Sequence, residues 1–188
     1  TWCRSPPSSR MNPDPLDGVT LTPLAPSDLE AVHAVQSDSD THLHDPAGRP
    51  TDIAATQRVI DMSQRSWDEH GFGLWTVRLA DGSVAGTCGA FVSKAAVWNL
   101  GYRLTPAAWG RGLASAAAAR AVTEARTADA ERPVVARVLV TNPGSVRVAE
   151  KAGLALAWRG PSYKGPERLI LTDRELAPSV LNRLVALG

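Results

Sequence analysis

The sequence predicts an α/β fold in which a mixed, mostly antiparallel sheet of about seven strands contains one central parallel pair, with helices on its flanks. Apolar runs at 74–79 and 84–92 flank Asp81-Gly82, a dipeptide typical of the tight turn in an antiparallel hairpin. A third antiparallel strand is expected at 96–104, where Pro106 follows and stops it.

The parallel pair follows from the next two segments. A helix is predicted from Leu113 to about Ala130, because this stretch is rich in alanine and carries small residues on one face. The β-branched run 133–140 is the strand after it. A helix that crosses over between two strands of one sheet makes them parallel, so 96–104 and 133–140 are expected to run side by side in one direction.

The beginning of the chain is predicted to be disordered over residues 1–18, which are rich in proline, serine and aspartate. A single domain is expected over 19–188, because the length suits one hydrophobic core. The alternating run 19–24 is the predicted first strand, and Pro23 would keep it at an edge of the sheet.

Two helices are predicted between this strand and the hairpin. Ser27 to Glu30 forms a capping box that starts a short helix to about Val35, and Thr51 is expected to cap a second helix that runs to about His70. The segment 36–50 between them carries His42, His44 and Asp45. A metal site is one interpretation of these side chains, but we favour a mobile loop over a binding cleft.

The last part of the chain is predicted to contain a short helix, a hairpin and a terminal helix. Asn142 is the expected N-cap of the short helix, with Pro143 in its first turn and Gly153 just past its end. The expected hairpin strands are 154–158 and 169–172, and residues 178–187 form the terminal helix, docked through Leu181, Leu184 and Val185.

Composition excludes several classes of function. Lys and Arg number 20 and Asp and Glu 19, so the near-zero net charge gives no indication of a nucleic-acid or membrane-surface partner. No apolar run has the length of a transmembrane helix, and the N-terminus lacks the apolar core of a signal peptide, so a cytoplasmic protein is expected. Cys3 and Cys88 give no disulfide framework, and Cys88 is expected in the core.

The most informative stretch is Trp109-Gly110-Arg111-Gly112-Leu113-Ala114-Ser115, at the predicted junction of strand and helix. Glycines permit a tight turn and a close approach of ligand to backbone, and the first N–H groups of the helix are without partners. With the positive end of the helix dipole, this favours binding of a phosphate or diphosphate, although a plain strand-to-helix turn also fits. The stretch is no Walker A loop, and Ser115 stands where a dinucleotide fingerprint needs glycine.

Three motifs in order resemble the GNAT superfamily of N-acetyltransferases, and within it the group that includes the ribosomal-protein N-terminal acetyltransferases. They are GYRL at 101–104, WGRGLAS at 109–115, and an Asn-x-x-Ser…Glu-Lys-x-Gly run from Asn142 to Gly153. The resemblance extends from Val19 to about Glu175. It implies a GNAT fold whose parallel strands splay apart, and acetyl-CoA as the cosubstrate, without a metal.

The resemblance also implies the site residues. The pantetheine arm would lie in the splay, with amides that need hydrogen-bond partners once buried, and the diphosphate would sit on the glycine turn. The implied coenzyme-binding residues are Tyr102, Arg103, Leu104, Trp109, Gly110, Arg111, Gly112, Leu113, Ala114, Ser115, Asn142 and Lys151. Many relatives place a tyrosine on the short helix to assist the departing thiolate, but Ala149 stands there, so Ser145 is the catalytic candidate; capping of the helix is the alternative for this serine.

The general base stays open at this point. Asn99 and Arg137 stand where relatives often carry glutamates. The alternatives are a chain of water molecules, Tyr163, Glu167, or an acid from the 36–70 region such as Asp68 or Glu69.

The expected reaction is transfer of an acetyl group from acetyl-CoA to a primary amine, by direct attack. The acceptor is a protein N-terminus or a small-molecule amine, and the pKa argument mildly favours an α-amine, or a small-molecule amine of similar basicity, over a lysine side chain. A coenzyme-binding sensor without turnover and an antibiotic-detoxifying acetyltransferase are the competing functions. The protein is expected to be a monomer or homodimer.

Overall fold

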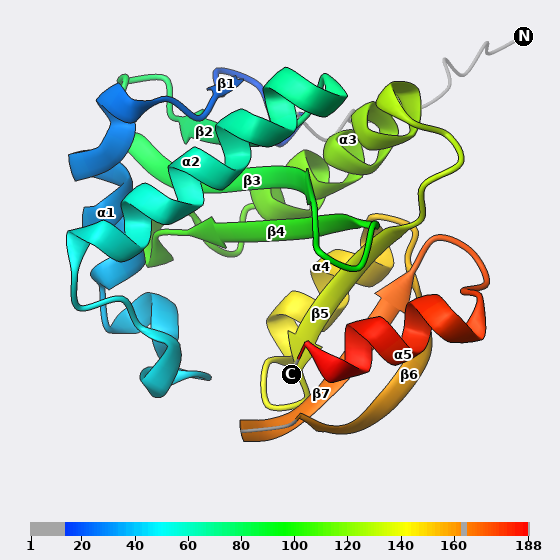
Figure 1. Ribbon diagram of the computed structural model, residues 1–188. Coiled ribbons are helices and arrows are strands. Elements are labelled where there is room, and N and C mark those ends of the chain that lie inside the picture. The colour runs from blue at the N-terminus through cyan, green and yellow to red at the C-terminus, as the bar shows by residue number, and fades with distance from the viewer. Residues whose placement is uncertain (1–13, 163–164, 188) are drawn as a thin grey trace, which may run out of the picture.

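The computed structural model describes residues 14–162 and 165–187, whose strands form one seven-stranded sheet in the order β1-β2-β3-β4-β5-β7-β6 (Figure 1). Neighbouring strands are antiparallel except β4 and β5, which are parallel. The predicted mixed sheet with one central parallel pair is therefore confirmed. The helices and strands are β1 (Thr20–Pro23), α1 (Leu29–Ser37), α2 (Ile53–His70), β2 (Leu74–Arg78), β3 (Val84–Val92), β4 (Trp98–Leu104), α3 (Leu113–Ala128), β5 (Val134–Leu139), α4 (Pro143–Lys151), β6 (Ala155–Ser162), β7 (Gly165–Thr172) and α5 (Pro178–Ala186).

Helices cover both faces of the sheet. Helices α3 and α4 lie on one face, and α1, α2 and α5 lie on the other (Figure 1). The largest core cluster joins small residues of α3, such as Ala117 and Ala121, to Trp98 and Leu100 of β4. The second face has two separate clusters, one under α1 and α2 and one under α5. Because side chains alternate along a strand, each strand residue belongs to one of these two faces.

The parallel strands β4 and β5 pair over only two residues each. Trp98 lies opposite Val134 and Asn99 opposite Val135, and beyond these pairs the two strands diverge. Figure 1 shows the resulting V, which is open toward the C-terminal end of β4. The splay that the resemblance implied is therefore present.

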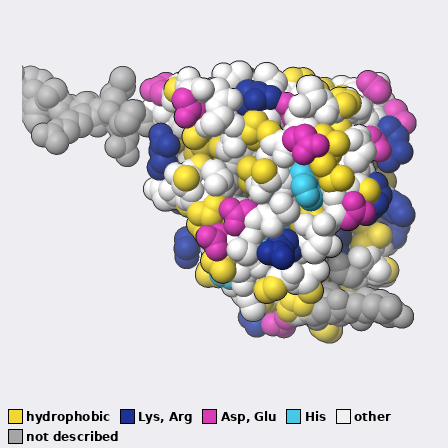
Figure 2. Space-filling model, turned by 90° about the vertical axis from the view of Figure 1, so that its left-hand side faces the viewer, with side chains coloured by type: hydrophobic (Ala, Val, Ile, Leu, Met, Phe, Trp, Pro, Cys, Tyr) yellow, Lys and Arg dark blue, Asp and Glu magenta, His cyan; other side chains and the backbone are white. Residues whose placement is uncertain are grey.

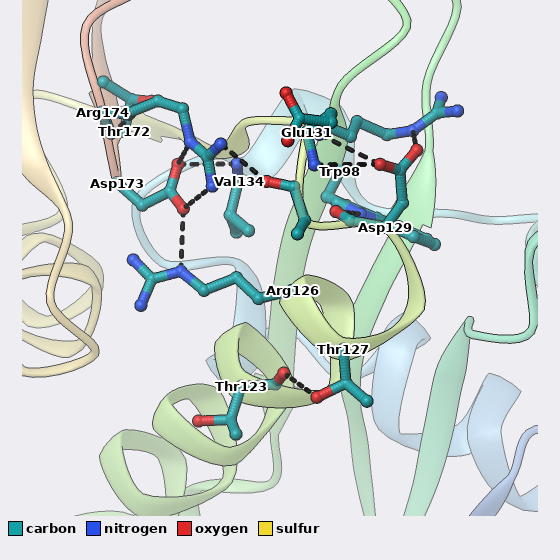
Figure 3. Close-up of polar contacts among 12 residues, drawn as sticks. Trp98, Thr123, Arg126, Thr127, Asp129, Glu131, Val134, Thr172, Asp173 and Arg174 are labelled. Carbon is teal, nitrogen blue, oxygen red and sulfur yellow. Dashed lines mark hydrogen bonds and ion pairs between the residues drawn. The ribbon is translucent and has the colours of Figure 1, made fainter.

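A buried carboxylate fixes the closed end of the V. Asp173 accepts hydrogen bonds from the Val134 N–H and from the side chains of Arg126 and Arg174, which joins α3, β5 and the end of β7 (Figure 3). Burial opposes ionisation of Asp173, but these donors hold the pKa of its carboxyl below the usual 3.8. The Trp98 indole N–H donates to the Asp129 carbonyl at the same end.

Helix starts differ from the prediction in two places. The capping box at Ser27 is wrong: residues 26–28 form a 3₁₀ turn, and Asp28 is buried, accepting bonds from the Ala25 N–H and from the side chains of Thr76 and Arg78. Thr51 is also not a cap, because the Asp52 carboxylate accepts from the Ala54 N–H. A side chain that reaches another strand can override a local capping pattern.

The final hairpin is longer than predicted. Residues 160–162 and 165–168, expected in a loop, extend β6 and β7, with register shifts between Leu156 and Trp158 and between Gly160 and Ser162. The other predicted strands and helices are present within a few residues of their expected limits. Leu184 of α5 is buried, and Leu181 and Val185 pack beside it, as predicted.

Most of the predicted disordered segment 1–18 lies outside the described residues. Residues 14–18 form a turn, from which Leu16 packs against the core. Within the described part of the chain, no helix is long and apolar enough to cross a membrane.

Gly86 provides a test of how tightly β3 and β4 are joined. It has a φ of +140°, and a Cβ there would collide with the Arg103 carbonyl oxygen of β4. We expect Gly86→Ala to lower the free energy of unfolding by at least about 2 kcal/mol, measured by urea denaturation, because both the backbone and the neighbouring strand must shift. Gly101→Ala is the control, since no atom lies within 4 Å of its added Cβ. Equal effects of the two substitutions would contradict this account.

Candidate active site

A cavity of about 300 Å³ lies where β4 and β5 diverge. Residues of both strands line it, together with side chains from β3, β7, the start of α4 and the segment after α1. On the side toward which the V opens, acidic, basic and apolar side chains are interspersed at the surface, without a large area of one charge (Figure 2). The surface therefore gives no indication of a charged ligand, and the candidate site is sought among the residues that line the cavity.

The backbone of β4 presents hydrogen-bonding groups to the gap. The Trp98 N–H donates to the Pro133 carbonyl on the β5 side, at 2.9 Å, whereas the Thr105 N–H donates to Ala85 on the β3 side. Because these directions alternate along a strand, the N–H and C=O groups of Leu100, Tyr102 and Leu104 point into the splay. An extended chain with amide groups could pair with this edge.

The glycine turn leads directly into the start of α3. Gly110 and Gly112 have φ values of +75° and +77°, a region that favours glycine. The first backbone bond of α3 runs from the Ala116 N–H to the Gly112 carbonyl, and among the described residues no side chain caps the helix. The N–H groups at 113–115 therefore have no partner within the helix.

Three residues of the glycine turn, Trp109, Arg111 and Gly112, have different environments. The Trp109 indole N–H donates to the Leu104 carbonyl at 2.8 Å, which fastens the turn to β4, and Arg111 is exposed. Pro15 of the N-terminal turn would lie 3.3 Å from a Cβ added at Gly112.

The start of α4 lies across the gap from this turn. Asn142 caps α4 as predicted, accepting the Ser145 N–H at 2.9 Å. The Tyr102 hydroxyl donates to the Ser145 carbonyl at 2.6 Å, and burial raises the pKa of Tyr102 well above 10. Asn142, Ser145 and Tyr102 all line the cavity, whereas Lys151 is exposed at the far end of α4. Within residues 14–162 and 165–187, no hydrogen bond of the Ser145 hydroxyl is present, so capping does not occupy it.

Arg103 has a different environment from its neighbours on β4. Its guanidinium contacts the Thr41 carbonyl and the His42 Nε2. The Thr141 hydroxyl donates to the His44 carbonyl from the end of β5. The predicted loop after α1 therefore crosses the opening of the V, attached to both strands. We call residues 38–52 the covering segment.

His42 is a structural rather than a catalytic histidine in this arrangement. It is 4% exposed, and its two ring nitrogens face Arg103 and the Asp45 carbonyl. Burial, and then the charge of Arg103, lower the pKa of His42 below 6.5, so the neutral ring accepts from Arg103. Among the described residues no group of three or more His, Cys, Asp or Glu side chains is placed to hold a metal ion.

Arg137 and Arg168 enter the cavity from β5 and β7. Arg137 pairs with Ile170 and Leu139 with Arg168, so the two arginines are diagonal neighbours on the face of α1, α2 and α5. The Nε of Arg168 is buried and makes no hydrogen bond in the described structure. Sequence reasoning missed Arg168 because its neighbours in the chain gave no motif.

Of the candidate bases, only an acid of the 36–70 region, Asp45, lies at the cavity among the described residues. Asp68 and Glu69 are exposed near the end of α2, and Glu167 is exposed and paired with Arg159 at 2.8 Å. Tyr163 lies outside the described residues. Asp45 is the one carboxylate among the described residues that line the cavity. Cys88 is fully buried, which raises the pKa of its thiol to about 12 and excludes it as a nucleophile.

A mixed sheet splayed at one parallel pair, and a helix α3 without a side-chain cap among the described residues, fit the fold that the three motifs implied. Residues 19–155 match the protein family described as the acetyltransferase (GNAT) domain. The chain belongs to this family, as the motifs indicated, and it is an acetyltransferase by that membership.

Solved structures share the fold. An acetyltransferase from Agrobacterium tumefaciens is 25% identical, with a TM-score of 0.69 and coverage of 93% of this chain and 98% of that one. A protein from Salmonella typhimurium, solved with its cofactor acetyl-CoA, is 19% identical (TM-score 0.65; 86% and 98% covered). Spermidine N-acetyltransferase from Vibrio cholerae, in complex with CoA and spermine, is 15% identical (TM-score 0.61; 83% and 94% covered).

The contact between His42 and Arg103 predicts a pH effect on stability. A histidine whose pKa is lowered by folding stabilises the fold above its ordinary pKa of 6.5 and loses that contribution as the pH falls below it, since the unfolded chain takes up the proton first. We expect the free energy of unfolding to fall between about pH 7.5 and about pH 5.5, and His42→Gln to remove part of that slope. Urea titrations at both pH values measure this.

His44→Gln is the control for this experiment, because His44 is exposed and contacts Thr141 through its backbone alone. The groups that face His42 are Arg103 and Asp45, and both remain in the two variants. The same slope in wild type and His42→Gln would contradict the assignment of His42 as a buried neutral acceptor.

Proposed function

We propose that the protein transfers an acetyl group from acetyl-CoA to the nitrogen of a primary amine. The observation that carries this proposal is the uncapped start of α3, which lies beside the open edge of β4. These two features offer separate partners to the two polar parts of coenzyme A, the diphosphate and the amide-bearing pantetheine arm. The Salmonella relative solved with acetyl-CoA supports the same assignment.

The diphosphate would bind the N–H groups at 113–115, at the positive end of the α3 dipole. Gly110 and Gly112 favour a close approach of the ligand to the backbone, because neither residue carries a side chain. Arg111 is near enough in the chain to add a positive charge. Lys151, from the Asn142–Gly153 motif, is proposed at the outer end of the coenzyme because it is exposed at the end of α4.

The pantetheine arm would pair with the inward-facing backbone groups of Tyr102 and Leu104, and Asn142 would contact it from α4. Arg103 is reassigned: its side chain fastens the covering segment, and its backbone belongs to the pairing with Thr87 of β3. It supports the site from the other side of β4.

The reaction joins the amine nitrogen to the carbonyl carbon of the thioester. The C–N bond forms, the C–S bond breaks, the amine loses a proton and the coenzyme leaves as a thiolate that takes one up. A backbone N–H of β4 near Leu104 would stabilise the oxyanion. The Ser145 hydroxyl, at the start of α4, would donate a hydrogen bond to the departing sulfur. The motifs around Trp109 and Asn142 resemble those of the ribosomal-protein acetyltransferases, and this resemblance supports our proposal that the chain belongs to that branch.

Gly112→Val tests the diphosphate site. We expect it to weaken binding of acetyl-CoA by at least about a hundredfold, measured by calorimetry, because the valine side chain obstructs the approach to the helix start. Gly71→Val is the matched control: Gly71 also has a positive φ, +72°, with nothing within 4 Å of an added Cβ, but it ends α2 away from the cavity. Wild-type affinity in Gly112→Val would place the phosphates elsewhere.

Ser145→Ala tests the role of the hydroxyl in departure of the thiolate. We expect kcat to fall by about 10²–10⁴ while the affinity for acetyl-CoA changes little, since the contribution arises in the transition state. The measurement is the release of free CoA thiol from acetyl-CoA in the presence of each of a series of amines. Ser179→Ala, at an exposed position in α5, is the control. An unchanged kcat would remove Ser145 from the mechanism, and binding without turnover of any amine by the wild type would favour a coenzyme sensor.

A further inference from the structure

We propose that Asp45 is a catalytic residue of the acetyl transfer: its carboxylate binds the amino group of the acceptor and takes the proton that the nitrogen gives up. This inference rests on the proposed function and adds a general base to the same site.

The covering segment holds Asp45 at the opening of the V. The His42 ring, on one side of the segment, contacts the Arg103 guanidinium of β4. The His44 carbonyl accepts a hydrogen bond from the Thr141 hydroxyl at the end of β5. Asp45 follows directly after these two attachments, so its backbone is tied to both of the diverging strands.

Both attachments lie beside groups proposed to bind the thioester. Arg103 lies on β4 between the two residues whose backbone groups face the gap, and Thr141 directly precedes Asn142, the cap of α4. Asp45 lines the same cavity as Asn142 and Ser145. An acceptor in this cavity would therefore contact Asp45 while its nitrogen approaches the thioester beside Ser145.

One oxygen of the Asp45 carboxylate is available to a ligand. Its Oδ1 accepts the Gly48 N–H at 3.1 Å, which caps the 3₁₀ turn Pro46–Gly48. Within residues 14–162 and 165–187, no hydrogen bond to Oδ2 is present. A carboxylate held through one oxygen keeps the lone pairs of the other for an N–H donor of the acceptor.

Asp45 is the one carboxylate among the described residues that line the cavity, and it alone among them can attract an ammonium ion by its charge. The other charged or titratable side chains of this lining are Arg103, Arg137, Arg168, His42 and His44. A guanidinium keeps its proton and cannot act as a base. The two ring nitrogens of His42 face Arg103 and the Asp45 carbonyl. His44 is exposed, and its neutral ring does not attract a cation by charge.

The proposed step begins with the acceptor as an ammonium ion, the main form of an alkylamine near neutral pH. An N–H bond breaks and the proton bonds to Oδ2 of Asp45, while the electron pair left on nitrogen attacks the thioester carbon. The carboxylic acid then releases the proton to water. Arg103, whose charge attracts that of Asp45, disfavours a second cation nearby and so favours loss of the proton from the ammonium ion.

Two derivatives of coenzyme A test the contact without knowledge of the natural acceptor. S-aminoethyl-CoA carries a primary ammonium group beyond the sulfur, and S-propyl-CoA carries a methyl group at the same position. We expect calorimetry near neutral pH to show that wild type binds the ammonium derivative at least about tenfold more tightly, through a charge-assisted hydrogen bond.

Asp45→Asn is expected to abolish this preference and to keep the affinity for S-propyl-CoA, because an amide oxygen can still accept the Gly48 N–H. Asp52→Asn is the matched control: Asp52 caps α2 from the same segment through its Oδ1 and does not line the cavity. It is expected to keep the wild-type preference.

Acetylation of ethylamine and of trifluoroethylamine tests the proton transfer. Near pH 7.5 the fluorinated amine is already neutral, whereas ethylamine is an ammonium ion, so only ethylamine needs the base. From the release of CoA thiol, we expect Asp45→Asn to lower kcat/KM for ethylamine by about 10²–10⁴ and for trifluoroethylamine by less than about tenfold. The loss with ethylamine is expected to shrink as the pH rises toward about 9.5, since solution then supplies the neutral amine.

Gly48→Ala tests the placement of the carboxylate. A Cβ at Gly48 would lie 2.8 Å from the Asp45 Cγ, so the carboxylate must move although its charge remains. We expect a loss of kcat/KM for ethylamine that is smaller than that of Asp45→Asn. His44→Gln, which removes the other candidate base of the covering segment, is expected to retain the wild-type value.

Several results would overturn this inference. They are equal affinities of the two derivatives for wild type, a deficit with ethylamine in His44→Gln rather than in Asp45→Asn, or an equal loss with both amines at every pH, as a purely structural role of Asp45 would give. If neither amine reacts, the pair of derivatives decides alone. Wild-type kcat/KM in Asp45→Asn would leave acetyl transfer intact, whereas absence of acetyl-CoA binding would overturn the proposed function itself.

Discussion

The restricted pairing of β4 with β5 is the constraint on which the rest of the site depends. Two strands with matched registers along their whole length would close the sheet and leave no edge for a ligand. Here pairing stops after Asn99 and Val135, while the Asp173 carboxylate and the Trp98 indole hold the closed end. A buried carboxylate that accepts several hydrogen bonds stabilises the fold, and removing it would leave its donors without an acceptor. The base of the opening is therefore held together by side-chain bonds, and the covering segment crosses its mouth.

Strand alternation then distributes the chemistry. On β4, the backbone groups of Tyr102 and Leu104 face the gap, while the intervening Arg103 side chain reaches the covering segment. On β5 and β7, the side chains of Arg137 and Arg168 project from the same face of the sheet. The sheet therefore separates helix α3, proposed for the coenzyme diphosphate, from the side chains of Arg137 and Arg168 on the opposite face.

Several structural features could be predicted from the sequence because they depend on residues close together in the chain. The Asp81-Gly82 turn, the crossover helix that makes β4 and β5 parallel, and the Asn142 cap were all predictable, because each depends on a few neighbouring residues. Asp28 and Arg168 were not. Asp28 bonds to Thr76 and Arg78 of a distant strand, and Arg168 reaches the cavity through the register of β7. Such placements depend on pairings far apart in the chain, which no short motif records.

The burial of Cys88 gives the protein an internal reporter of its own opening. Its thiol is 0% exposed in the middle of β3, between β2 and β4. An alkylating reagent can reach it only when the core packing beneath α3 opens, so its labelling rate reports such fluctuations of the structure. With Cys3 replaced by serine, labelling with and without a bound ligand would measure how far occupancy of the neighbouring gap restrains the sheet.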